Sequence, residues 1–167
     1  MPGKKPVYYG WGHPIGNNCT WDEGRAALEK VWNHPDGLLC QNAKFDLDVA
    51  ETHMDLPMPA WERVHDTMFL LFLDDPHQMK LELKPSAERL LGMAPEEQDA
   101  VADWLVENQP IPGVKISKSK TSDHYFGRYI VYAPGHIVGK YADGDVIRTE
   151  KIFDLLWKKT EERGALS

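Results

Sequence analysis

The spacing of apolar and polar positions along the chain predicts short strands that alternate with helices, a pattern typical of an α/β protein. The expected strands are short runs rich in apolar, aromatic or β-branched side chains. They lie at residues 6–11, 38–40 and 62–66. The expected helices have apolar residues three and four positions apart. They lie at 21–32, from the neighbourhood of 46 to 54, and at 67–73, 85–91, 95–107 and 134–157, with Gly144 a candidate for a bend.

The first of these helices has the clearest local signal. Thr20-Trp21-Asp22-Glu23 fits a capping box, in which Thr20 is the N-cap and Glu23 reaches back three positions. We expect the helix that follows to bury Ala27, Leu28 and Val31.

Composition narrows the class of protein. A chain of 167 residues with 42% hydrophobic side chains predicts one globular domain over residues 1–167, large enough to bury a core. Residues 1–5 are expected to form a flexible N-terminus and residues 158–167 a charged tail. The net charge of −7 argues against indiscriminate binding to polyanions, although a local basic patch can still bind nucleic acid.

The sequence also argues against a membrane-spanning segment, a disulfide framework and a zinc site. The longest wholly apolar run, residues 68–73, is far shorter than the ~20 residues that span a bilayer. The N-terminus lacks the apolar segment of a secretion signal. Two cysteines do not make a disulfide framework, which favours a reducing, cytoplasmic location. A zinc site built from Cys19, Cys40, His13 and His34 is disfavoured because their spacing matches no familiar zinc pattern.

A first candidate for chemistry is Asp46, which follows the predicted strand at 38–40 and falls near the start of a helix. It therefore lies at the carboxyl end of a strand, where ligands and metals collect in open α/β sheets. The alternative is that Asp46 is only a helix-starting acid, favoured there by the helix dipole.

A second candidate is the pair formed by Tyr141 and Asp145 in the last predicted helix. Residues four positions apart on a helix share one face, so a phenol and a carboxylate can point into the same site. A carboxylate can hold a divalent ion, and a phenol beside it can orient the water that the ion activates. The alternative is a core tyrosine next to an exposed acid.

A third candidate is the basic and aromatic segment at 115–132. Cations can follow the phosphates of single-stranded DNA while aromatic rings stack on its bases. The residues assigned to such an interface are Lys115, Lys118, Lys120, Tyr125, Phe126 and Arg128. A mobile, solvated loop beside a core aromatic cluster explains the same segment equally well.

Two motifs taken together resemble a known family. Asn42-Ala43-Lys44-Phe45-Asp46 and Tyr141-Ala142-Asp143-Gly144-Asp145 are similar to the second and third motifs of the 3′–5′ proofreading exonuclease of family-A DNA polymerases. Between them, residues 65–68 (His-Asp-Thr-Met) and 73–76 (Leu-Asp-Asp-Pro) resemble another segment of that family. Residues 7–14 resemble its third strand and the loop after it. The resemblance covers residues 6–163 and implies an RNase H-like fold of the tyrosine-bearing DEDD branch.

The resemblance also implies roles for five residues. Asp46 and Asp145 would be metal ligands, Asp145 directly and Asp46 partly through water. Tyr141 would position the attacking water, and Asn42 and Phe45 would shape the site around Asp46. The implied reaction is two-metal hydrolysis at the 3′ end of single-stranded DNA. Oxygen ligands suit Mg²⁺ or Mn²⁺ and do not choose between them.

The sequence departs from the family in one respect. It contains no Asp-x-Glu, the first motif, which supplies the other two metal-binding carboxylates. We therefore expect an N-terminally truncated RNase H-like fold without its first two strands, with a helix-rich C-terminal half and exposed sheet edges. We also expect little or no activity from the chain alone. A separate chain carrying the missing strands, or the polymerase module, is the expected partner.

Such a layout would suit a split gene or a truncated reading frame, for instance of a polymerase made in a phage-infected cell. Two other interpretations remain. One is a catalytically inactive module that binds single-stranded DNA or docks a polymerase. The other is an unrelated α/β domain in which Asp46, Tyr141 and Asp145 coincide by chance.

Overall fold

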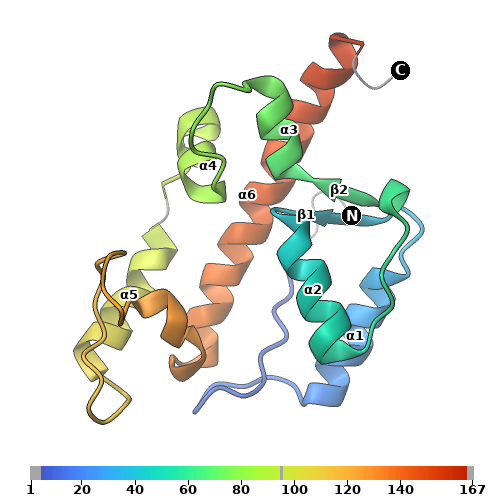
Figure 1. The fold of residues 1–167 in the computed structure, drawn as a ribbon. Helices are drawn as coiled ribbons and strands as arrows, with labels where there is room; N and C mark the ends of the chain where they lie inside the picture. The colour runs from blue at the N-terminus through green and yellow to red at the C-terminus, as the bar shows by residue number, and fades with distance from the viewer. Residues whose placement is uncertain (1–4, 95, 165–167) are drawn as a thin grey trace. The chain divides into compact units, whose positions relative to one another are not determined.

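The computed structural model describes residues 5–94 and 96–164. Most of the expected flexible N-terminus and residues 165–167 of the expected charged tail lie outside the described residues. The chain is mixed α/β and rich in helix, as predicted (Figure 1). Its elements are α1 (Trp21–Trp32), β1 (Leu38–Cys40), α2 (Ala43–Met54), the 3₁₀ helix η1 (Trp61–Arg63), β2 (Val64–Asp66), α3 (Thr67–Asp74), α4 (Leu83–Leu91), α5 (Glu96–Asn108), the 3₁₀ helix η2 (Phe126–Tyr132) and α6 (Gly135–Glu162).

The chain divides into two compact units. Unit 1 contains Arg25–Ala94 and the chain from Asp145 onward, and unit 2 contains Lys5–Gly24 together with the chain from α5 to Gly144. The expectation of a single domain stays a prediction. Among the described residues, none of the helices combines the length and the apolar character needed to cross a membrane.

Unit 1 contains a two-stranded parallel sheet. β1 and β2 pair in the register Leu38 to Val64, Leu39 to His65 and Cys40 to Asp66. Parallel strands need a crossover connection, and here it contains α2. α3 begins directly after the carboxyl end of β2, and α2 begins after a short turn that follows the carboxyl end of β1 (Figure 1). A core cluster joins α3, α4 and α6 in this unit: Leu70, Leu71, Ala87, Ile152 and Leu156.

Unit 2 has its own core, formed by α5, the segment after it, and the first turns of α6. The buried members are Val101, Ala102, Leu105, Ile116, Phe126, Ala133 and Val138. Tyr8 from the N-terminal segment packs against this cluster.

The strand predicted at residues 6–11 is wrong, because this segment is irregular. Its backbone groups bond to Asn18 instead of to another strand. The Asn18 amide donates to the Tyr8 carbonyl at 2.7 Å, and its oxygen accepts the Gly10 N–H at 2.7 Å. The Asn18 N–H also donates to the Gly10 carbonyl at 3.0 Å. Since these bonds satisfy the polar backbone, the aromatic composition alone does not make a strand.

The capping box is confirmed. The Thr20 N–H donates to the Glu23 carboxylate at 2.7 Å, and the Glu23 N–H donates to the Thr20 hydroxyl at 3.2 Å.

Of the three residues expected to be buried along α1, Ala27 and Leu28 are only half-buried and Val31 is exposed. Val31 is 55% exposed, whereas Trp32 is only 5% exposed. The indole N–H of Trp32 donates to the Pro57 carbonyl at 2.8 Å, so this larger side chain takes the buried position.

The boundaries of the other helices and strands agree with those predicted from the sequence, except in three places. α2 begins at Ala43 rather than near Asp46. The predicted strand at 62–66 is split into η1 and β2. α6 is one helix that continues to Glu162, through the first half of the expected charged tail.

Candidate functional site

The carboxyl edge of the sheet is organised by Asp66, the last residue of β2. Its carboxylate accepts the backbone N–H groups of Asn42 at 2.9 Å, of Ala43 at 2.8 Å and of Met68 at 2.8 Å. The N–H groups at a helix start have no partner within the helix, so an acid that accepts them stabilises it. This buried carboxylate therefore caps the starts of both α2 and α3.

Asn42 makes the turn from β1 into α2. Its φ of 64° is in the left-handed region, which asparagine adopts more readily than most residues. Its side chain makes no capping bond, because Asp66 binds the backbone in its place. Beside it, the Gln41 amide donates to the Leu81 carbonyl at 2.9 Å and its oxygen accepts from the Thr67 hydroxyl.

Asp46 lies in the first turn of α2, close to Cys40 and Asp66. Although the residue is exposed, protein atoms crowd its carboxyl group and raise its pKa to about 6. The negative charge of Asp66 raises the pKa of Asp46 further, and a hydrogen bond from the Cys40 thiol lowers it. Burial raises the pKa of the Cys40 thiol to about 12, and the negative charges of Asp46 and Asp66 contribute to this increase.

Asp145 lies on α6 and is held by basic side chains. The Lys84 ammonium lies 2.8 Å from one carboxylate oxygen of Asp145 and 3.1 Å from the other. Arg148, one turn further along α6, has a nitrogen 3.9 Å from the same carboxylate. The Arg148 guanidinium is almost fully buried, which lowers its pKa, and it donates to the Ala94 carbonyl at 2.6 Å.

Two other predicted site residues are aromatic, one at the surface and one half-buried. Phe45 is 65% exposed in the first turn of α2. Tyr141 is half-buried one turn before Asp145 on α6, and it packs against the core of unit 2. The described contacts thus give Asp46 and Asp145 different neighbours: Cys40 and Asp66 for the first, Lys84 and Arg148 for the second.

These residues do not make a complete divalent-metal site. Mg²⁺ and Ca²⁺ take six or more oxygen ligands, several of them from carboxylates or water. Among the side chains that the structure describes, those of residues 5–94 and 100–164, no group of three or more His, Cys, Asp or Glu could hold a metal ion. Three backbone N–H groups bind the Asp66 oxygens, and the Lys84 ammonium binds those of Asp145.

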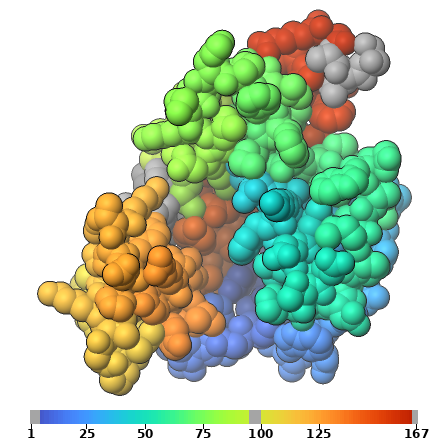
Figure 2. Space-filling view, in the orientation of Figure 1, coloured from blue at the N-terminus to red at the C-terminus, as the bar shows by residue number. Residues whose placement is uncertain are grey.

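The basic and aromatic segment at residues 115–132, which is expected to bind nucleic acid, is partly exposed and partly buried. It is coloured yellow to orange in Figure 2, where many of its atoms lie on the visible face. Lys115 and Lys120 are exposed, as is Lys118, which forms an ion pair with Asp103. Arg128 is exposed and donates to the Asp123 carbonyl at 3.0 Å.

The aromatic residues of this segment differ in accessibility. Phe126 is only 4% exposed and belongs to the core of unit 2, so no base can stack on it in this conformation. Tyr125 is half-buried, with its ring centre 4.6 Å from that of Phe126. Tyr132, at the end of the segment, is 41% exposed, so the accessible part of the segment includes its cations and this ring.

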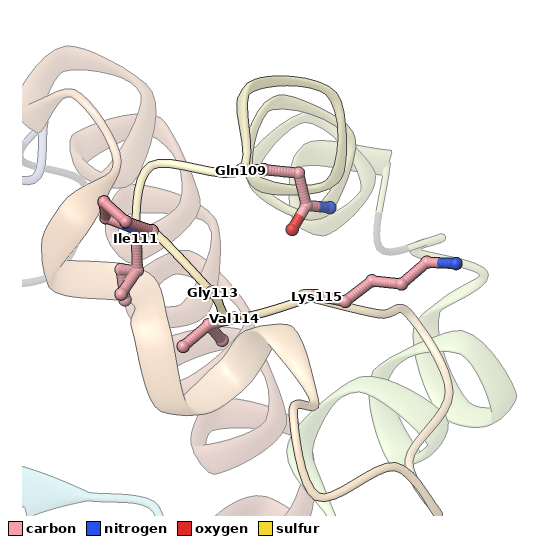
Figure 3. Close-up of a pocket in the computed structure, with 6 residues that line it drawn as sticks. Gln109, Ile111, Gly113, Val114 and Lys115 are labelled. Atoms are coloured by element: carbon pink, nitrogen blue, oxygen red, sulfur yellow. The ribbon is translucent and has the colours of Figure 1, made fainter.

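A shallow hollow lies beside this segment, in the loop after α5 (Figure 3). It is lined by Gln109, Ile111, Pro112, Gly113, Val114 and Lys115. The Gln109 amide donates to the Val106 carbonyl at 2.8 Å and its oxygen accepts the Ile116 N–H at 2.7 Å, which fixes both ends of the loop. The Lys115 side chain extends away from the apolar Ile111 and Val114.

Three residues of these sites were not identified from the sequence. Asp66 could have been identified, because an acid directly before an apolar helix is a typical N-cap. Lys84 and Arg148 have no such local signal: Lys84 is 61 residues from Asp145 in the sequence. No protein-family model, no curated protein and no solved structure matches this chain.

Proposed function

We propose that this chain is part of a 3′–5′ exonuclease domain with an RNase H-like fold, acting on the 3′ ends of single-stranded DNA. The observation that supports the proposal best is the placement of the acids of its two motifs. Asp46 follows the carboxyl end of β1 in a parallel β-α-β unit, and Tyr141 and Asp145 lie one turn apart on α6. The carboxyl edge of parallel strands is where α/β proteins bind ligands.

The site needs further ligands before it can hold Mg²⁺ or Mn²⁺. The sequence has no Asp-x-Glu, and the described residues offer no group of three metal ligands. We therefore propose that another polypeptide segment supplies the missing carboxylates, together with strands that pair with the short sheet. In the completed site Asp46 and Asp145 would be metal ligands and Tyr141 would orient water.

The test is a gel assay with single-stranded DNA labelled at its 5′ end, in the presence of Mg²⁺ or Mn²⁺. One reaction contains the chain alone, and another adds a polypeptide that carries the Asp-x-Glu strands. We expect stepwise shortening from the 3′ end only in the second reaction. Asp145→Ala should abolish most of this activity, while Asp154→Ala, which changes an exposed acid on the same helix, should not.

Full activity of the completed enzyme with Asp145→Ala would overturn the site assignment. DNA binding without cleavage in both reactions would favour the second candidate, a module that binds single-stranded DNA or docks a polymerase. That candidate is supported by the exposed cations Lys115 and Lys120, and by the fact that Lys84 already binds Asp145.

A further inference from the structure

The end of η2 in unit 2 exposes an aromatic ring that no proposed site has used. Tyr132, its last residue, is 41% exposed, whereas Phe126 is 4% exposed and Tyr129 is half-buried against the core of unit 2. Val131 is 50% exposed, and Arg128 of the same helix is exposed too. A ring, an aliphatic side chain and a cation are therefore accessible at this end of η2.

The backbone on both sides of Tyr132 is held by one side chain, that of His13. Its ring nitrogen Nδ1 lies 3.2 Å from the Val131 carbonyl oxygen and 3.0 Å from the Ala133 carbonyl oxygen. Both oxygens can only accept, so Nδ1 carries the proton and donates to both. The other ring nitrogen, Nε2, lies 2.7 Å from the Tyr8 hydroxyl. Tyr132 is thus fixed in place before any ligand binds, which lowers the entropy cost of binding one.

The two segments that His13 joins contain no acidic side chain. Residues 5–21 and 124–142 have no Asp or Glu, although the whole chain has 26 of them. The cations of these segments, Lys5, Arg128 and Lys140, are all exposed. A polyanion would therefore meet attraction and no repulsion from these two segments, in spite of the net charge of −7.

We propose that Tyr132 stacks on an unpaired base of single-stranded DNA, while the cations of the same two segments contact its phosphates. The inference rests on the proposed function for its ligand class. An exposed ring suits this ligand because every base has a face on which an aromatic side chain can stack. Tyr132 therefore takes the role that burial denies to Phe126.

The test measures binding of the whole chain to two labelled single strands by fluorescence anisotropy, at low salt and with EDTA. One strand is an oligothymidylate, and the other is an abasic strand of the same length. Both carry the same phosphates, so the ratio of their dissociation constants isolates the contribution of the bases. The variants are Tyr132→Leu and Tyr132→Phe, and the matched control is Phe69→Leu, which changes a ring of α3 in unit 1 that is 64% exposed. Circular dichroism checks the fold, and Tyr132→Ser replaces Tyr132→Leu if that variant does not fold.

We expect the unchanged chain to bind the oligothymidylate at least about fivefold more tightly than the abasic strand, the size of one stacked base. Tyr132→Leu should remove most of this preference, whereas Tyr132→Phe and Phe69→Leu should keep it. Equal affinity of the unchanged chain for both strands would overturn the proposal, as would a preference that survives in Tyr132→Leu, or no binding to either strand.

Because EDTA prevents metal-dependent cleavage, this result is independent of the exonuclease assay. A completed enzyme that fails to cut DNA would reject the proposed function alone. A completed enzyme that cuts DNA, together with equal binding of the two strands, would reject the role of Tyr132 alone.

Discussion

The carboxylate of Asp66 joins the last residue of β2 to the first residue of α2, because it accepts the backbone N–H of Ala43 at 2.8 Å. The same carboxylate accepts N–H groups from Asn42 and Met68. One buried acid thus connects the ends of both strands to the starts of two helices. The position of Asp46, one turn into α2, depends on this junction.

Replacing Asp66 should therefore cost more stability than replacing an ordinary surface acid. We expect Asp66→Ala to lower the free energy of unfolding by about 2–4 kcal/mol, since it removes two helix caps and charge-assisted hydrogen bonds. Urea denaturation followed by circular dichroism measures the change. Asp48→Ala, which alters an exposed acid on α2, should stay within about 0.5 kcal/mol of the unchanged chain. Equal effects of the two substitutions would contradict the capping role.

The raised pKa of Asp46 predicts a pH dependence of stability. Its pKa is about 6 in the folded chain and near its ordinary value of 3.8 when unfolded, so the folded state binds more protons between these values. The contribution of Asp46 to stability is therefore complete below pH ~4 and is lost as the pH rises through ~6. Because the residue is exposed, solvent screening reduces the size of this effect.

The difference in urea midpoint between the unchanged chain and Asp46→Asn should change across this window, and Asp48→Asn should show no comparable change. A carboxyl carbon resonance of Asp46 that titrates near pH 4 would contradict the prediction directly.

Cys40 should be an unreactive thiol. Its pKa of about 12 leaves almost no thiolate at neutral pH, and the thiolate is the form that reacts. In a Cys19→Ser background we expect slow alkylation by iodoacetamide, with a rate that still rises above pH 10. Asp46→Asn should speed the reaction at pH 9, because it removes a negative charge that raises the pKa of Cys40. A rate that reaches its plateau by pH 9 would show that this thiol is not shielded.

Local signals in the sequence predicted much of the fold. The capping box at Thr20 and Glu23 and the apolar run of β1 each lie within a few residues, and both predictions are confirmed. The failures came from contacts that only the folded chain makes. Asn18 takes the hydrogen bonds that a neighbouring strand would supply, and Pro57 binds the indole of Trp32.

The candidate site also combines features that the sequence predicts with features that it could not predict. The place of Asp46 just after a strand follows from adjacent residues, so the sequence could predict it. The partner of Asp145 could not be predicted, because a lysine in the first turn of α4 has no pattern that indicates an acid in α6. Phe126 carries the same aromatic signal as its neighbours, and only packing in unit 2 distinguishes a buried ring from an exposed one.

The exposed lysines of unit 2 give the last prediction. Lys115→Glu combined with Lys120→Glu should weaken binding to a single-stranded oligonucleotide at least about tenfold at low salt, because attraction to two phosphates is replaced by repulsion. The slope of log affinity against log salt should fall by about 1.4, or about 0.7 for each phosphate that the protein no longer neutralises. Fluorescence anisotropy of a labelled oligonucleotide measures both quantities.

The matched control combines Lys30→Glu with Lys158→Glu, which changes the same net charge at two exposed positions in unit 1. If both double variants bind the oligonucleotide equally weakly, the effect is one of overall charge and not of a local interface. A weakening confined to the variant at Lys115 and Lys120 would instead assign DNA binding to this segment. Since Phe126 is buried, the cations and not that ring would then bind the DNA.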